Sequence, residues 1–130
     1  MTARLPERPR FSVITVCYNS AETIAATLRS VNEQRWAEVE HIVIDGGSQD
    51  ETLAIVAAVG KRVSSVTSEP DEGIYDAMNK GIALATGDII AFLNADDVYA
   101  HDGVLDRIAA LMSEAELDVA YGAVSYTHLT

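Results

Sequence analysis

Short apolar runs alternate with amphipathic segments along this chain of 130 residues, and this alternation restricts the fold more than any other feature. Strands are predicted at 11–18, 41–44, 63–67 and 89–93, of which 63–67 is the weakest. The segments between them carry apolar residues at helical spacing. Such alternation predicts an α/β fold in which a mostly parallel sheet is covered by helices on both faces.

Two of the predicted helices begin at motifs that resemble a capping box. Asn19 is followed three residues later by Glu22, and Ser48 by Glu51, so helices are expected to start at these positions. A third helix is expected over 73–85, with Ile74, Ala77, Met78 and Ile82 on its apolar face. The remaining expected elements are a helix at 104–111 and a strand at 119–121.

Polar side chains follow three of the predicted strands at the point where each strand ends. They are Thr15, Cys17, Tyr18 and Asn19 in the first, Asp45 in the second, and Asn94, Asp96 and Asp97 in the fourth. Right-handed crossovers bring the carboxyl ends of parallel strands to one edge, where open α/β sheets bind ligands. The adjacent carboxylates favour a cation or a hydroxyl-rich ligand between them, and a solvated turn is the alternative.

Composition limits the choice of partner. The chain has 9 basic and 20 acidic residues and a net charge of −11, which argues against a nucleic-acid surface. An anionic ligand could bind only where the negative electrostatic field of the chain is offset locally, and a divalent cation held by carboxylates would offset it. The lone Cys17 is interpreted as a small buried strand residue rather than a nucleophile. With neither a signal peptide nor an apolar span in the sequence, the expected location is cytoplasmic.

Taken in order, four motifs give the chain a clear resemblance to a known family. They are 12–19, 42–48 with Asp50 and Thr52, 68–81, and 86–88 leading into 92–97. In these motifs the chain resembles the family 2 glycosyltransferases, which are inverting enzymes that use nucleotide sugars. The segment 68–81 is most similar to members that build bacterial exopolysaccharide or other cell-surface glycans.

The resemblance implies a Rossmann-like nucleotide-diphospho-sugar transferase fold of the GT-A type, truncated at its C-terminus. Residues 1–10 are then a flexible basic leader, and 11–124 are the nucleotide-sugar-binding half of the domain. The tail 125–130 has no family counterpart and resembles a translated sequencing adapter. The catalytic base is expected beyond residue 130, and any membrane association of the parent enzyme in segments outside this chain, at the inner face of the membrane.

The resemblance also implies roles for particular residues. Thr15, Tyr18 and Asn19 would lie against the nucleotide, and Asp45 would accept a hydrogen bond from the base, unless Asp45 is simply a turn residue. Asp96 would bind Mg or Mn, helped by Asp97. Asn94 replaces the first aspartate of the D-x-D motif and could bind a ribose hydroxyl.

The same resemblance places the segment around 76–80 beside the nucleotide sugar. Asp76, Asn79 and Lys80 share one predicted helical face, and Lys80 would contact a phosphate. The alternative is an exposed ion pair between Asp76 and Lys80. The acidic residues Glu69, Asp71 and Glu72 before this helix are expected in a solvated loop.

The function that follows is transfer of a sugar from a UDP- or GDP-type donor to a glycan or lipid-linked acceptor, with inversion. A non-catalytic nucleotide- or sugar-binding module would share every residue named here. A dinucleotide-binding oxidoreductase is a weaker alternative, because the turn at 17–23 contains no glycine and so lacks G-x-G-x-x-G.

Overall fold

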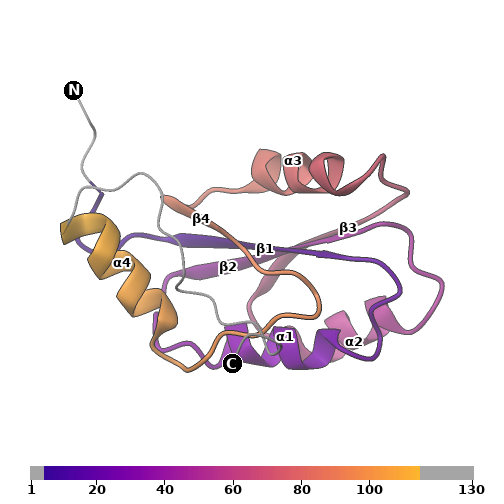
Figure 1. Ribbon diagram of the computed structural model, residues 1–130, viewed down its shortest axis with the longest axis horizontal. Helices are drawn as coiled ribbons and strands as arrows, with labels where there is room; N and C mark the ends of the chain where they lie inside the picture. Colours follow the sequence, from indigo (N-terminus) through magenta and orange to yellow (C-terminus); the bar gives the residue numbers. More distant parts are fainter. Residues whose placement is uncertain (1–4, 115–130) are drawn as a thin grey trace.

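A four-stranded parallel sheet forms the centre of the computed structural model, which describes residues 5–114 (Figure 1). The elements are β1 (Phe11–Cys17), α1 (Ile24–Asn32), β2 (Val39–Asp45), α2 (Thr52–Val59), β3 (Val63–Ser68), α3 (Ile74–Leu84), β4 (Ile89–Phe92) and α4 (Val104–Glu114). The strand order is β3-β2-β1-β4, and the two central strands, β2 and β1, are the most deeply buried. The predicted α/β alternation is confirmed for these eight elements.

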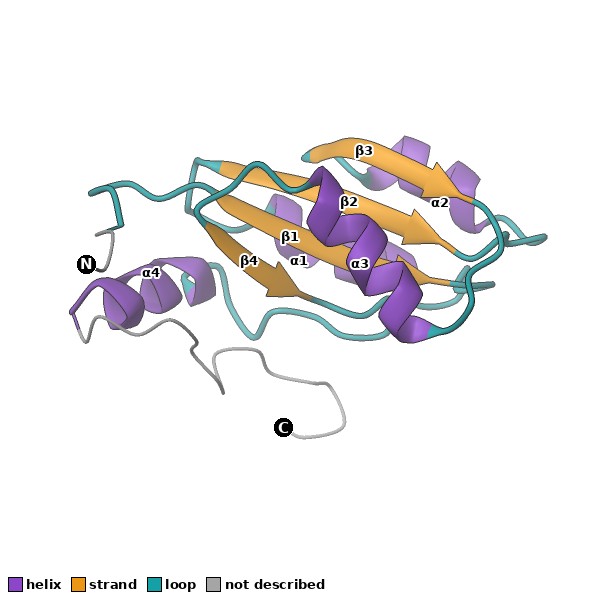
Figure 2. Cartoon of the chain, turned by 90° about the horizontal axis from the view of Figure 1, so that it is seen from above, coloured by secondary structure: helices purple, strands orange, loops and turns teal. Residues whose placement is uncertain are grey.

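Helices cover both faces of the sheet, as predicted (Figure 2). Alternate side chains of β1 point to opposite faces, which explains why both faces are apolar. Phe11 and Val13 pack with residues of α1 and α4, and Val43 of β2 packs against α1 and α2. Ile14 packs on the other face, in a cluster that includes Ala77 of α3.

The two predicted helix starts are wrong by several residues. Helix α1 begins at Ile24, and Asn19 instead adopts a left-handed conformation with φ +47°. Helix α2 begins at Thr52, whose N–H donates to Asp50 Oδ1 at 3.0 Å, and the N-cap residue Glu51 makes no side-chain capping bond. The cause is competition for the same polar groups. Ser48 Oγ donates to Asp45 and accepts from the Asn19 N–H, and Asn19 Oδ1 accepts from the Gln49 N–H, so neither side chain is left to bond a helix amide.

Helix α3 buries fewer and smaller residues against the sheet than the spacing of its apolar residues predicts. Ala77 and Gly81 are the buried residues, whereas Ile74 and Ile82 are 52% and 44% exposed. Gly81 permits this close approach, because a Cβ at that position would lie 2.5 Å from Cγ2 of Ile14.

Part of the predicted leader lies against the domain. Leu5 packs on the cluster formed by β1, α1 and α4, and Trp36 Nε1 donates a 2.8 Å hydrogen bond to the carbonyl of Pro9. The expected strand at 119–121 and the tail 125–130 lie outside the described residues. Within 5–114, no helix is long and apolar enough to cross a membrane.

Candidate functional site

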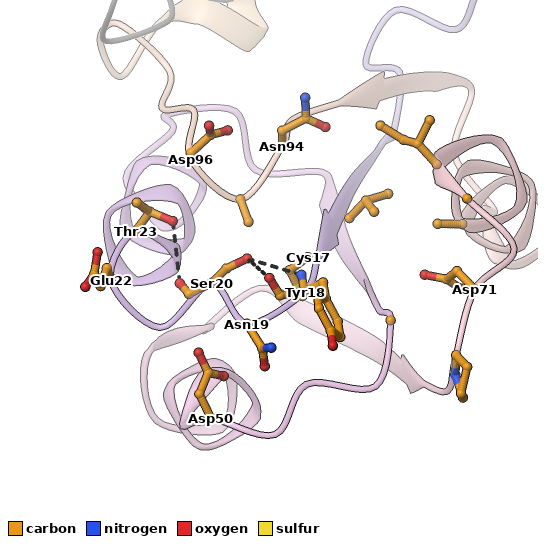
Figure 3. Close-up of a pocket in the computed structure, with 17 residues that line it drawn as sticks. Cys17, Tyr18, Asn19, Ser20, Glu22, Thr23, Asp50, Asp71, Asn94 and Asp96 are labelled. Atoms are coloured by element: carbon orange, nitrogen blue, oxygen red, sulfur yellow. Dashed lines mark hydrogen bonds between the residues drawn. The ribbon is translucent and has the colours of Figure 1, made fainter.

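A cavity of about 860 Å³ lies where the strands end, and the loops after all four strands line it (Figure 3). The polar lining side chains are Tyr18, Asn19, Ser20, Glu22 and Thr23 after β1, Asp50 after β2, Asp71 after β3, and Asn94 and Asp96 after β4. The structure therefore brings together Tyr18, Asn19, Asn94 and Asp96 of the predicted site residues. Five further lining residues were not predicted from the sequence as parts of the site: Ser20, Glu22, Thr23, Asp50 and Asp71.

Asp45 lies beneath this cavity rather than in its lining, and it is fully buried. Its Oδ2 accepts from the backbone N–H groups of Gly47 and Ser48 at 3.0 and 2.7 Å and from Ser68 Oγ at 2.8 Å. Its Oδ1 accepts from Ser48 Oγ at 2.5 Å and from Cys17 Sγ at 3.3 Å. Asp45 thus ties the ends of β1 and β3 to the turn after β2.

The same contacts determine the direction in which the pKa values of Asp45 and Cys17 are shifted. Burial alone would raise the pKa of the Asp45 carboxyl, but the hydrogen bonds from Ser48 and Ser68 outweigh it and hold the pKa below its usual range. Burial and the neighbouring Asp45 raise the pKa of the Cys17 thiol. Cys17 is 3% exposed, which confirms the interpretation as a buried strand residue.

The loop after β1 is held by the loop after β2. The Asn19 N–H donates to Ser48 Oγ at 2.7 Å, and Asn19 Oδ1 accepts from the Gln49 N–H at 2.8 Å. One residue further on, the Ser20 N–H donates to Thr52 Oγ1 at 2.8 Å. These contacts leave the Tyr18 side chain 60% exposed at the cavity. Thr15, in contrast, is buried in β1 with Oγ1 2.7 Å from His41 Nε2 and does not line the cavity.

The two adjacent carboxylates after β4 have different surroundings. Asp96 lines the cavity, while Asp97 is 2% exposed and lies outside the lining. Thr27 of α1 holds the turn between them, since its hydroxyl is 2.9 Å from the Ala95 carbonyl and 2.7 Å from the Asp97 carbonyl. A threonine on the buried face of an amphipathic helix is the only sequence signal for this contact.

Lys80 of α3 points into a group of carboxylates and not into the cavity. Its Nζ lies 2.7 Å from Asp71 Oδ1, 3.1 Å from Glu69 Oε1 and 3.4 Å from Asp76 Oδ2. The Asp71 bond is the main reason that the pKa of Lys80 is raised. Asp76, Asn79 and Lys80 share a helix as predicted, but they are absent from the cavity lining.

The expectation of a solvated acidic loop before α3 holds for Glu69 and Glu72, which are exposed, and is wrong for Asp71. The Asp71 side chain is 12% exposed and bonded to Lys80, whereas the Glu69 side chain is 56% exposed. The Glu72 N–H donates to Asp76 Oδ2 at 3.0 Å, so the loop is also fixed at its far end.

Comparison with known proteins gives this arrangement a family. Residues 12–128 match the sequence model of a family described as "Glycosyl transferase family 2". A PGL/p-HBAD biosynthesis glycosyltransferase of Mycobacterium bovis is 40% identical over 121 residues, covering 89% of this chain and 47% of the relative. The amylovoran biosynthesis glycosyltransferase AmsB of Erwinia amylovora is 36% identical over 106 residues, covering 78% of this chain and 35% of the relative. The chain spans less than half the length of these relatives.

Solved structures support the same assignment. Staphylococcus aureus TarS 1-349 in complex with UDP-GlcNAc gives a TM-score of 0.76 at 29% identity, covering 82% of this chain and 32% of TarS. The mannosyltransferase PcManGT of Pyrobaculum calidifontis, in complex with GDP-Man and Mn²⁺, gives 0.76 at 28% identity, covering 85% and 34%. These likenesses show the predicted GT-A type fold. The match to the family covers residues 12–128, which include all the loops that line the cavity, and the chain therefore belongs to glycosyl transferase family 2.

Proposed function

We propose that this chain forms the donor-binding part of a glycosyltransferase that moves a sugar from a nucleoside-diphosphate sugar to a glycan or lipid-linked acceptor, with inversion. The observation that carries the proposal is the cavity of about 860 Å³ at the carboxyl ends of four parallel strands. Its size is in the range of small-molecule sites, and an aromatic ring and a carboxylate lie at different parts of its wall. Two structural neighbours hold nucleotide sugars, which supports the same class of ligand here.

The lining residues suggest how the donor lies. The Tyr18 ring, exposed at the cavity, offers a surface on which a base can stack. Asn94, on the loop after β4, can exchange hydrogen bonds with a ribose hydroxyl. Asp96, two residues further along the same loop, then faces the diphosphate.

A divalent cation, Mn²⁺ or Mg²⁺, is part of the proposal. Within residues 5–114 no three His, Cys, Asp or Glu side chains form a group able to hold a metal by themselves. Such a sparse donor set fits a cation that takes one protein carboxylate, here Asp96, and completes its shell with phosphate oxygens and water. When bound, the cation would offset the charge of the leaving diphosphate. Asp97 was expected to help, and its burial favours Asp96 alone.

The residues of this chain bind and orient the donor in the proposed reaction. The acceptor hydroxyl attacks the anomeric carbon, the bond to the diphosphate oxygen breaks, and the hydroxyl proton passes to a base. That base stays a prediction for segments beyond residue 130. Asp45 and Thr27 keep the loops around the donor in place from beneath.

Titration calorimetry of this chain with UDP, GDP and NAD, each with and without Mn²⁺, tests the proposal. We expect a nucleoside diphosphate to bind and Mn²⁺ to tighten it, with no binding of NAD. Asp96→Ala should remove the Mn²⁺ effect, and Asp102→Ala, which alters an exposed acid outside the cavity lining, should keep it. Unchanged Mn²⁺ dependence in Asp96→Ala would refute the metal assignment, and NAD binding would favour an oxidoreductase.

A further inference from the structure

Asp71 places a carboxylate oxygen over a glycine at the cavity wall. A Cβ built on Gly46 would lie 3.1 Å from Asp71 Oδ2 and 3.4 Å from Tyr18 Cδ1. The side chain of Asp71 therefore fills the space that any larger residue at position 46 would take. Figure 3 shows it reaching into the cavity from the α3 side, toward Tyr18. A ring that can stack on a base and an acceptor that can meet its edge thus lie together.

Asp45, the residue that the family resemblance suggests for the base, has its acceptor capacity filled. A carboxylate has about four lone-pair sites, and five donors of the chain already surround this one. Reaching a ligand would require Asp45 to break contacts that tie the ends of β1 and β3 to the turn after β2. Among the lining carboxylates, Asp71 is the one that approaches the Cβ position of Gly46, which also lies beside the Tyr18 ring.

Lys80 fixes which oxygen of Asp71 is available. Its ammonium bonds Oδ1 at 2.7 Å and the Pro70 carbonyl at 3.4 Å, so it holds both the side chain and the loop. Oδ2, the oxygen over Gly46, has no bond to Lys80 among the described contacts. The ammonium also offsets the negative charge that Asp71 would bring near a diphosphate.

We propose that Asp71 Oδ2 accepts the ring N–H of the donor's base, with Lys80 as the positioning residue. The inference rests on the proposed function and names the group that selects the base. Uracil and guanine present a ring N–H on that edge, whereas cytosine presents a ring nitrogen lone pair. A lone pair facing a carboxylate is repulsive, so the site selects UDP- or GDP-type donors against CDP-type donors.

The test compares the dissociation constants of UDP, GDP and CDP for this chain and two variants. The unaltered chain should bind UDP or GDP at least about tenfold more tightly than CDP, the scale of one charged hydrogen bond. Asp71→Asn should reduce that preference about tenfold, because the amide can donate to the cytosine nitrogen. Glu69→Gln is the matched control, since Glu69 also contacts Lys80 but lies outside the cavity lining, and it should keep the preference.

Binding of uridine and of UDP by Lys80 variants distinguishes a Lys80 that positions Asp71 from a Lys80 that contacts a phosphate directly. If Lys80 positions Asp71, Lys80→Met should weaken uridine and UDP by the same factor, and Lys80→Arg should restore part of both. Weakening of UDP alone would mean a phosphate contact and would overturn the positioning role. Circular dichroism and urea unfolding confirm that each variant is folded.

Gly46→Ala provides an independent variant should Asp71→Asn fail to fold. Its methyl group would displace Oδ2 and should also reduce the preference over CDP. An unchanged preference in a folded Asp71→Asn or Gly46→Ala protein overturns the inference and leaves the proposed function standing. A folded chain that binds none of the three diphosphates overturns both.

Discussion

Strand β2 carries a buried carboxylate near each end, and the two have opposite consequences for the site. Glu40 at the amino end and Asp45 at the carboxyl end are 5% and 0% exposed, and the pKa of each is lowered by hydrogen bonds that outweigh burial. Among the described residues, Glu40 bonds only to residues that pack against one another, and we call this end of the sheet the closed end. Asp45 holds loops whose other residues line the cavity, and we call this end the open end. A buried acid with a lowered pKa is therefore not by itself a mark of a ligand site.

The closed end is built from residues far apart in the sequence. Glu40 Oε2 accepts from Ser12 Oγ at 2.5 Å and from the N–H and hydroxyl of Thr86 at 2.6 and 2.9 Å, and Arg10 lies 3.5 Å from Oε1. Ser12 Oγ in turn accepts from the Gly87 N–H at 2.7 Å. These contacts join β1, β2 and the turn before β4, and they have the pattern of a purely structural network.

The largest expected effect comes from Asp45→Ala. It leaves the N–H groups of Gly47 and Ser48 and the hydroxyl of Ser68 without their acceptor, so we expect a loss of about 4 kcal/mol in the free energy of unfolding. Nucleotide binding should weaken as well, because the loops lose their anchor. Urea unfolding followed by circular dichroism measures the first effect and calorimetry the second. A loss below about 1 kcal/mol would show that Asp45 is not the anchor.

Glu40→Gln should separate stability from binding. The amide oxygen can replace Oε2, but the NH₂ group then faces the Arg10 guanidinium, and the bonds from Ser12 and Thr86 lose their charged acceptor. We therefore expect a loss of about 2 to 3 kcal/mol in the free energy of unfolding. The dissociation constant of the nucleoside diphosphate, measured well below the unfolding transition, should stay the same. A change in that constant would mean that the two ends of the sheet are coupled.

His41, between the two acids on β2, should dominate the acid sensitivity above pH 4. Burial lowers its pKa from 6.5 to about 4, so the unfolded chain takes up a proton before the native protein does. Stability is then present above pH 6.5 and is lost as the pH falls toward 4. From pH 7 to pH 5 we expect a loss of about 2 kcal/mol, measured by urea unfolding at each pH.

The lowered pKa values of Glu40 and Asp45 act in the same direction at lower pH. His41→Gln identifies the histidine's share, because it should flatten the change between pH 7 and 5 while leaving the steeper loss at lower pH. An unchanged slope in His41→Gln would assign the sensitivity to other groups.

The sequence predicted the sheet because three of its four strands are largely apolar runs, a signal carried by consecutive residues; β3, with the sequence VSSVTS, was the weakest of the four predictions for the same reason. It also predicted which loops meet, since parallel strands have one common carboxyl edge. The partners of individual side chains could not be predicted in the same way. Asp45 takes donors from Cys17 and Ser68 on two other strands, and Asp71 meets Gly46 across 25 positions of sequence. Such contacts follow from packing, which no local motif encodes.

Capping signals failed for a related reason. Asn19 and Ser48 have the side chains that cap helices, but in the folded chain Ser48 accepts the Asn19 N–H and bonds Asp45. A polar residue near a ligand site has several possible hydrogen-bond partners, and a capping-box motif takes account only of the partner that lies closest in the sequence.

The smallest expected effect compares a crowded glycine with an open one. At the closed end, a Cβ on Gly87 would lie 2.6 Å from Ser12 Oγ and 2.7 Å from the Arg10 carbonyl oxygen, so Gly87→Ala forces the backbone apart and should cost about 2 kcal/mol. At the open end, Gly73 has no atom within 4 Å of its Cβ position, and only its φ of +112° opposes a side chain. With ψ at 176°, this backbone lies in a region that glycine alone adopts readily, so Gly73→Ala should cost about 1 kcal/mol, the lower end of the range for such strain, with no contribution from crowding. Urea unfolding of both variants decides the comparison, and a Gly73→Ala cost equal to that of Gly87→Ala would mean that backbone strain at the cavity matches crowding at the Glu40 end of the sheet.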